Sequence, residues 1–443
     1  MTYSITNIAR FASAELTLSG LTVLSGTNGS GTTTIAKALY AAVKSEIALS
    51  QHCNEEKVEL LARIAALLAA MYAQDHAAVP IDGALKERII HLERLCDHIS
   101  SGDGDLRPAL ALCLQLMEEE PIQEFLSHDG HFADDLAKMI EALKRPLSVE
   151  DSPATRTLAE RAFRAEFGDQ LANLAHQGEI SHVLCGASGF SFSEGVCTSA
   201  RIAEPRFRNV IYLDDLPVIE AHVAEGEGGD AASSRPLFSV GDDHRRDLLA
   251  MLHAITQETK NEVSKDLLEE AGEAPSKILG GLLGGRLEYR SEREGFVYRE
   301  EERDIALSNM GGGSKVLALL ELLLRSGCIH GSTCLIIDEP EAHLHPQWQI
   351  QMAELLVSLA KDTKAKILIS THSPYVVEAV RVYSQIAGME EQTGFYHALK
   401  TGVFSSTLRD VSDDISPIYA ELAEPYRTLD AVYDNAGDLG HGE

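Results

Sequence analysis

Short apolar segments separated by small polar residues open the chain. Segments 3–8, 15–18 and 21–25 are rich in β-branched residues, which predicts three strands. A glycine-rich turn at 26–31 follows, and residues 33–40 have the composition of a helix. The start of the chain therefore predicts three strands, a glycine loop and a helix.

The pattern changes after residue 45. Apolar residues recur at helical spacing in four stretches, and Ser152 followed by Pro153 predicts the start of the fourth. No heptad repeat is sustained, which argues against a long coiled coil. We therefore expect a compact helical insertion over 46–178.

Strands and helices alternate in the rest of the chain. Strand patterns occur at 180–184 and 210–213, and a hairpin pattern occurs at 286–298. In the final third, a helix through 317–324 precedes a strand at 334–337, a helix at 347–360 and a strand at 367–370. This order predicts an α/β fold, a mixed sheet with flanking helices. The expected parts are a discontinuous head (1–45 and 179–443), the insertion, a flexible acidic loop (224–236) and an acidic C-terminal tail (407–443).

Composition narrows the class of protein. The 443 residues carry a formal net charge of −30, which argues against a surface largely covered by nucleic acid but leaves room for one local basic groove. No apolar run is long enough to span a bilayer, and no secretory signal is visible at the N-terminus. The seven cysteines include no CxxC pair. We therefore expect a cytoplasmic protein with reduced thiols and no membrane contact.

The loop from Gly26 to Thr33 follows a strand and opens a helix. It fits the phosphate-binding pattern G-x-x-x-x-G-K-[ST] at every position except Thr32, which replaces the lysine. The Thr33 hydroxyl is the expected Mg²⁺ ligand. The candidate phosphate-binding residues are Asn28, Gly29, Ser30, Gly31, Thr32, Thr33 and Thr34. On its own, the loop is also compatible with a glycine-rich turn that binds no ligand.

Three further segments suggest the same chemistry. The apolar run 334–337 ends in Asp338, a candidate Mg²⁺ ligand, and Glu339, a candidate general base. The run 367–370 leads to His372, which is placed to sense a γ-phosphate. Segment 307–315 places small residues before a leucine-rich helix, where N–H groups can meet an anion. The candidate contacts there are Ser308, Gly311, Gly312 and Gly313.

In this order the four segments resemble the ATP-binding-cassette (ABC) ATPases. The resemblance implies that ATP and Mg²⁺ bind between a Walker A loop (26–33) and the Walker B pair Asp338-Glu339, with His372 as the switch histidine and 307–315 as the signature loop. Segment 341–346 takes the place of the D-loop. Its two histidines also have the look of a metal pair, but a dimer contact explains them better. The signature departs from L-S-G-G-Q, so any of its three glycines can be the phosphate contact. Asp214 or Asp215 is the Q-loop candidate.

The helical insertion after the first helix resembles the SMC/RecF/OLD side of this superfamily. Segments 337–349 and 371–375 are most similar to the PtuA-like ATPases of Septu and retron-associated anti-phage systems. That resemblance implies a head-to-tail dimer or larger even oligomer, a separately encoded HNH-type nuclease, and in retron systems a reverse transcriptase with its msDNA. Nucleic acid is then contacted through the partner, and this chain senses infection and regulates the nuclease.

Thr32 is the main departure from the family pattern. A threonine offers a hydroxyl where the lysine would neutralise phosphate charge, so we expect weaker ATP binding and impaired hydrolysis. A naturally degenerate cassette and an introduced substitution both account for it. Two other functions stay open: a RecF/SMC-like DNA-repair ATPase, and a pseudo-ATPase scaffold that binds nucleotide as a structural ligand.

Overall fold

The computed structural model has two compact units, which we call the head and the helical unit. The head comprises Met1–Ile47 and Glu150–Glu443, and the helical unit comprises Ala48–Val149. The structure describes residues 1–73, 83–100, 106–128, 130–144, 151–214, 243–258, 273–290 and 295–439. The predicted acidic loop 224–236 and the Q-loop candidate Asp215 lie outside these residues.

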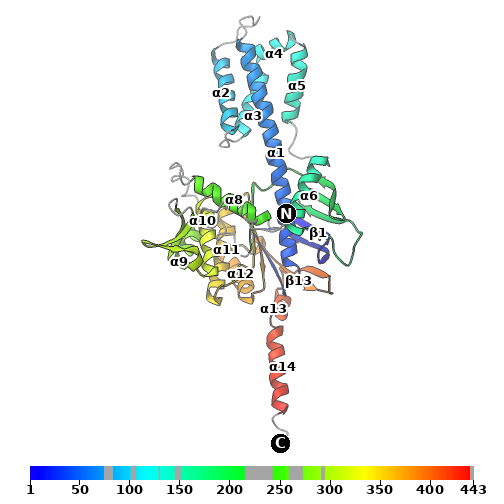
Figure 1. The fold of residues 1–443 in the computed structure, drawn as a ribbon, viewed down its shortest axis with the longest axis vertical. Helices are drawn as coiled ribbons and strands as arrows, with labels where there is room; N and C mark the ends of the chain where they lie inside the picture. Colours follow the sequence, from blue (N-terminus) through cyan, green and yellow to red (C-terminus); the bar gives the residue numbers. More distant parts are fainter. Residues whose placement is uncertain are drawn as a thin grey trace, which may run out of the picture. The chain divides into compact units, whose positions relative to one another are not determined.

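The head is built on an eleven-stranded mixed sheet (Figure 1). The strand order is β6-β5-β4-β1-β2-β14-β13-β3-β12-β11-β7. The strands are β1 (Thr2–Ile8), β2 (Phe11–Thr17), β3 (Leu21–Gly26), β4 (Ser181–Cys185), β5 (Ser188–Ser193), β6 (Val196–Arg201), β7 (Asn209–Leu213), β11 (Thr333–Asp338), β12 (Lys366–Thr371), β13 (Thr393–Lys400) and β14 (Ser406–Asp410).

Five neighbouring strands of this sheet, β13, β3, β12, β11 and β7, run parallel. The register places Asp338 opposite Ser370, Thr371 opposite Ser25, and Gly26 opposite Ala398. Because the carboxyl ends of parallel strands lie at one edge of a sheet, the loops that follow these five strands meet there.

Helices and a small second sheet complete the head. The helices are α6 (Pro153–Phe167), α8 (Asp243–Glu258), α9 (Glu273–Leu282), α10 (Gly312–Arg325), α11 (Pro346–Thr363), α12 (Pro374–Ala387), α13 (Ser416–Leu422) and α14 (Glu424–Leu439), with short 3-10 turns η4 (Leu307–Asn309) and η5 (Glu390–Gln392). The second sheet contains β8 (Gly285–Arg290), β9 (Gly295–Glu300) and β10 (Arg303–Ala306). Buried leucines, isoleucines and valines of helices α8, α9, α10, α11 and α12 form one core with the parallel strands. This core confirms the predicted α/β class.

The helical unit has a core of its own. It contains α2 (Gly83–Ser100), α3 (Leu106–Met117), α4 (Glu120–His128), α5 (Gly130–Lys144) and the second part of α1 (Thr32–Ala73). Leu61, Ile64 and Leu68 of α1 are buried there with Ile89 and Leu92 of α2. The predicted helix at 33–40 and the apolar stretch from residue 60 are thus one helix, because no glycine or proline interrupts α1.

The insertion is shorter in the structure than the sequence pattern predicts. The compact helical unit ends at Val149 instead of residue 178, and α6 packs against β6 of the head. Ser152 caps α6 through the backbone N–H of Thr155, and Gly168, at φ 59°, ends it. Helical spacing predicts that a helix forms, but it does not indicate which unit the helix packs against. None of the described helices is long and apolar enough to cross a membrane.

Candidate functional site

The glycine loop after β3 has a geometry that only glycine permits at key points. A Cβ at Gly26 would lie 2.4 Å from the carbonyl oxygen of Ala398 on β13. Gly31 adopts φ 103°, and a Cβ there would lie 2.6 Å from the Phe11 ring. Helix α1 then begins at Thr32, and the N–H groups of its first turn have no partner within the helix. The loop and helix terminus form a cradle that fits phosphate oxygens.

The structure brings the two predicted Mg²⁺ ligands together. The exposed Thr33 side chain donates a hydrogen bond of 2.8 Å from Oγ1 to Oδ2 of Asp338, 305 positions later in the chain. Asp338 also accepts hydrogen bonds from the hydroxyls of Tyr212, at 3.3 Å, and Ser370. A hydroxyl and a carboxylate side by side are the oxygen ligands that Mg²⁺ takes beside nucleotide phosphates, so these residues fit the ion. Thr32, in contrast, is buried.

His372 and Glu339 lie next to this pair. His372 Nε2 is 3.5 Å from Glu339 Oε1, and its Nδ1–H donates to the carbonyl oxygen of Gly26. The His372 backbone N–H donates to Oε1 of Glu341 at 2.7 Å, and the Thr371 hydroxyl donates to the same oxygen at 2.8 Å. Burial raises the pKa of Glu341. The histidine is thus held between the start of the glycine loop and Glu341, with Glu339 within reach.

The predicted signature loop packs against segment 341–346. Helix α10 begins at Gly312, with Gly311 at its N-cap. Cβ atoms at Gly312 and Gly313 would lie 2.9 Å from the His343 ring and 2.3 Å from the Leu344 side chain, whereas Gly311 is exposed and a Cβ there would meet nothing within 4 Å. Of the three candidate glycines, Gly311 has the open approach. Ser308 lies in η4, and its side chain is outside the described residues.

Gln349 links segment 341–346 to Ser373, which directly follows His372. The Ser373 hydroxyl, which caps α12, donates to the side-chain oxygen of Gln349 at 2.6 Å, and the amide of Gln349 donates to the Leu344 carbonyl at 2.9 Å. No group of three or more His, Cys, Asp and Glu side chains suited to a metal ion occurs in the part of the chain that the structure describes. The dimer contact of His343 and His345 stays a prediction.

Asp214, the Q-loop candidate, belongs to a buried ion network that the sequence did not reveal. His244 is buried between Glu166, 2.8 Å from Nδ1, and Asp214, 3.1 Å from Nε2. Arg245 also pairs with Asp214 at 2.7 Å. Burial alone would lower the pKa of His244, but hydrogen bonds to both carboxylates raise it to about 9. Burial would raise the pKa of Asp214, but hydrogen bonds from His244 and Arg245 lower it.

This network reaches the candidate Mg²⁺ site through Tyr212. The rings of Tyr212 and His244 stack with centroids 4.5 Å apart, and the Tyr212 hydroxyl contacts Asp338. Tyr212, His244 and Glu166 belong to β7, α8 and α6, and no local motif joins these segments. Only the folded structure shows that they meet.

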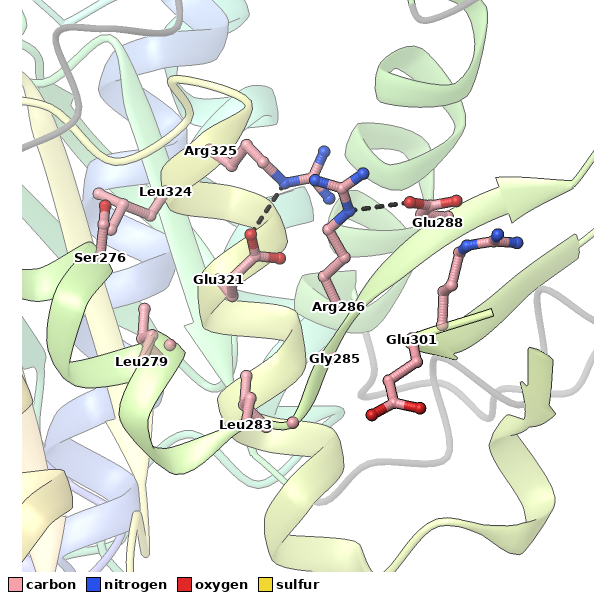
Figure 2. A pocket seen from close by; sticks show the side chains of 13 residues that line it. Ser276, Leu279, Leu283, Gly285, Arg286, Glu288, Glu301, Glu321, Leu324 and Arg325 are labelled. Atoms are coloured by element: carbon pink, nitrogen blue, oxygen red, sulfur yellow. Dashed lines mark hydrogen bonds and ion pairs between the residues drawn. The ribbon is translucent and has the colours of Figure 1, made fainter. Parts of the chain in front are cut away.

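Two pockets of the head are candidates for a ligand. One, of about 470 Å³, is lined by Asp214, Asp338, Glu339 and Val316, so the end of β11 that carries the predicted Walker B pair is open to a ligand. The other, of about 1050 Å³, lies between α9, α10 and the small sheet (Figure 2). Two of the arginines that line it are paired with carboxylates: Arg286 with Glu288 at 2.8 Å, and Arg325 with Glu321 at 2.9 Å.

Part of the head matches a known family. Residues 241–377, which include the signature loop, Asp338, Glu339 and His372, match the family model of an AAA ATPase domain. Together with the parallel strand order, this match defines the class: an α/β head of which residues 241–377 are similar to an ATPase domain.

Within that class, part of the chain is similar to Septu protein PtuA from Bacillus thuringiensis, with 33% identity over 109 residues. The matched stretch is 22% of this chain and 27% of that protein, so the chain spans about a quarter of the length of this relative.

The comparison with solved structures finds SMC heads at low TM-scores. One is the SmcHead bound to the C-winged helix domain of ScpA, with TM-score 0.40 and 12% identity over 92% of this chain and 97% of that one. Another is the SMC head domain from Thermotoga maritima, with TM-score 0.34 and 13% identity over 93% of this chain and 98% of that one. The fold class therefore rests on the strand order and the site described above.

Proposed function

We propose that this chain is the ATP-binding subunit of an anti-phage defence complex and that it regulates a separately encoded nuclease of the HNH type. The observation that carries the nucleotide site is the 2.8 Å hydrogen bond between Thr33 and Asp338, which joins two motifs from opposite ends of the head sequence. The defence role is supported by the similarity to Septu protein PtuA.

The residues suit nucleotide binding better than rapid hydrolysis. Bound Mg²⁺ would supply positive charge to the phosphates beside Thr33 and Asp338. Glu339, exposed and close to His372, can accept a proton from a water molecule, and His372 can donate from Nε2 to a terminal phosphate oxygen when its ring carries both protons. Thr32 contributes no charge, and we propose that turnover is slow for this reason.

Replacing Thr32 with lysine tests the nucleotide site. We expect ATP turnover to rise about 100-fold or more in Thr32→Lys, the scale on which one preorganised electrostatic group acts. Thr428→Lys is the control, because it adds the same charge at an exposed position on α14. Failure of the native chain and of Thr32→Lys to bind ATP would contradict the proposed site.

A pseudo-ATPase scaffold is the second candidate function, and Thr32 is the observation that favours it. If Thr32→Lys binds ATP more tightly but hydrolyses none, nucleotide acts as a structural ligand. The stacked Tyr212 and His244 behind Asp338 would then serve stability alone.

The partner site that we propose is α14. This helix exposes Tyr426, Leu429 and Tyr433, with 68%, 64% and 81% of their surfaces accessible, at helical spacing. Acidic residues accompany them, so a nuclease with a basic, apolar groove would fit. Co-purification with the HNH-type nuclease should be lost in Leu429→Ser and retained in Arg427→Gln, whose side chain is also exposed on this helix. Direct DNA binding by the isolated chain would instead favour a RecF/SMC-like repair ATPase.

Two further features accompany this proposal. The open approach to Gly311 suits a phosphate presented by a second copy, as in a head-to-tail dimer. None of the seven cysteines forms a disulfide, as expected in a reducing cytoplasm, where we place the complex.

A further inference from the structure

Lys400 lies beside the glycine loop, although it is far from it in the sequence. Strand β13 runs parallel to β3, and its residue Ala398 is level with Gly26, so the strand ends at Lys400 next to the loop. A Cβ placed on Gly29 would lie 3.4 Å from the Lys400 ammonium nitrogen and 3.6 Å from its Cε. The ammonium group therefore rests against the loop backbone at a position where glycine leaves space.

The turn that carries Lys400 is held in place by the neighbouring turn of the sheet. Arg10, between β1 and β2, donates from Nη1 to the Val403 carbonyl at 2.9 Å, and its own carbonyl accepts from the Ser406 N–H at 2.8 Å. Within the turn, the Thr401 N–H donates to the Ser405 carbonyl at 3.0 Å. The base of the Lys400 side chain is thus fixed relative to the loop.

Lys400 is also available for a ligand. Its side chain is exposed, and it forms no ion pair or hydrogen bond with any residue in the described ranges. Two other lysines at the start of α1 are already engaged with acids: Lys37 lies 4.0 Å from Glu166, and Lys44 lies 2.7 Å from Asp247. The cation nearest the open side of the loop is therefore not committed elsewhere.

We propose that Lys400 supplies the positive charge that Thr32 does not, and binds the phosphate oxygens of a nucleoside triphosphate held by the loop. This inference rests on the proposed nucleotide site. A lysine on a neighbouring strand can serve because phosphate recognition by an ammonium group depends on its position and charge, and not on the part of the chain that provides it. The charge is then delivered from β13 across the mouth of the loop.

The test is the affinity for mant-ATP with Mg²⁺, measured by fluorescence for the full chain and its variants. Lys400→Met should weaken binding about 10-fold or more, the scale of one charge-assisted hydrogen bond. Lys400→Arg should retain most of the affinity. Arg409→Met is the matched control, because Arg409 is an exposed cation on the adjacent strand β14, and its loss should change affinity little.

The same Lys400→Met change in the Thr32→Lys chain tests whether Lys400 takes the place of the missing loop cation or merely lies near the loop. In Thr32→Lys the loop has its own cation, so Lys400→Met should then cost much less affinity. An equal loss in both backgrounds, or an equal loss in Arg409→Met, would overturn the assignment. Unchanged binding by Lys400→Met, with the native chain binding mant-ATP, would overturn this inference alone. No binding by the native chain or by Thr32→Lys would overturn the proposed nucleotide site as well.

Discussion

His244 should hold its positive charge in the folded head at pH values where an unfolded histidine is neutral. Its ring is buried, with Glu166 2.8 Å from one nitrogen and Asp214 3.1 Å from the other. These two carboxylates raise the pKa of His244 to about 9 in spite of burial. The perturbation that we propose is His244→Gln, which keeps a polar side chain of similar size but cannot carry the charge.

The expected magnitude follows from the pKa. Because the folded pKa is raised above the unfolded value of 6.5, the stabilisation is fully present below pH 6.5 and is lost as pH rises through about 9. A difference of this size corresponds to about 3 kcal/mol, or a slope of about 1.4 kcal/mol per pH unit within the window. His244→Gln should therefore be less stable than the native chain at pH 6, and the gap should narrow toward pH 9.

The single tryptophan provides the assay. Trp348 packs against the core of the head, so its fluorescence during urea unfolding reports on the head. Unfolding free energies would be measured from pH 6 to 9.5 for both chains. The control is His182→Gln, because His182 is exposed and lies beside the Ser191 hydroxyl, and its profile should run parallel to the native one.

Parallel profiles for the native chain and His244→Gln would refute the reasoning, because the ion network would then contribute no pH-dependent stability. Glu166→Gln provides a second measurement. It removes one of the two carboxylates that raise the pKa of His244, so its profile should fall less steeply than the native one between pH 6.5 and 9.

Two further predictions concern Glu46, which is buried in α1, and Gly31, which directly precedes this helix. Burial raises the pKa of Glu46 to about 7, so ionisation of this carboxyl removes stability as pH rises from 4.5 to 7. Glu46→Gln should therefore stabilise the head at pH 8 by up to about 3 kcal/mol and have no effect near pH 4. Equal melting temperatures at pH 8 would contradict this. Gly31→Ala should destabilise the head by about 1–3 kcal/mol and reduce ATP binding, because Gly31 has φ 103° and the new Cβ would meet the Phe11 ring. Gly280→Ala, in a helix with open space, is the control and should be neutral or stabilising.

The sequence predicts those site residues that are recognised from their immediate neighbours in the chain. Asp338 and His372 each follow a buried apolar run, and a strand that ends in a polar residue can be identified without its neighbours. Lys400 and His244 could not be found in this way. Their importance depends on which strand lies beside β3 and which helix covers β7, and such pairings between distant segments are set by packing of the whole head. The insertion is shorter than the sequence pattern predicts for the same reason, since α6 has helical spacing but packs on the sheet of the head.

The charges of the chain decide how ATP is attracted to the glycine loop. A net charge of −30 repels a nucleotide, but screening limits that effect to about 10 Å at 0.1 M salt, so binding is decided by the groups at the loop itself. At that edge of the sheet, Lys400, His372 and the start of α1 attract phosphate, while Asp338, Glu339 and Asp214 repel it unless Mg²⁺ intervenes. With Thr32 uncharged, we expect affinity for ATP to depend strongly on Mg²⁺, and Thr32→Lys to weaken that dependence. A polyanion as long as DNA would need a continuous series of cations, so we expect nucleic acid to be bound by the partner.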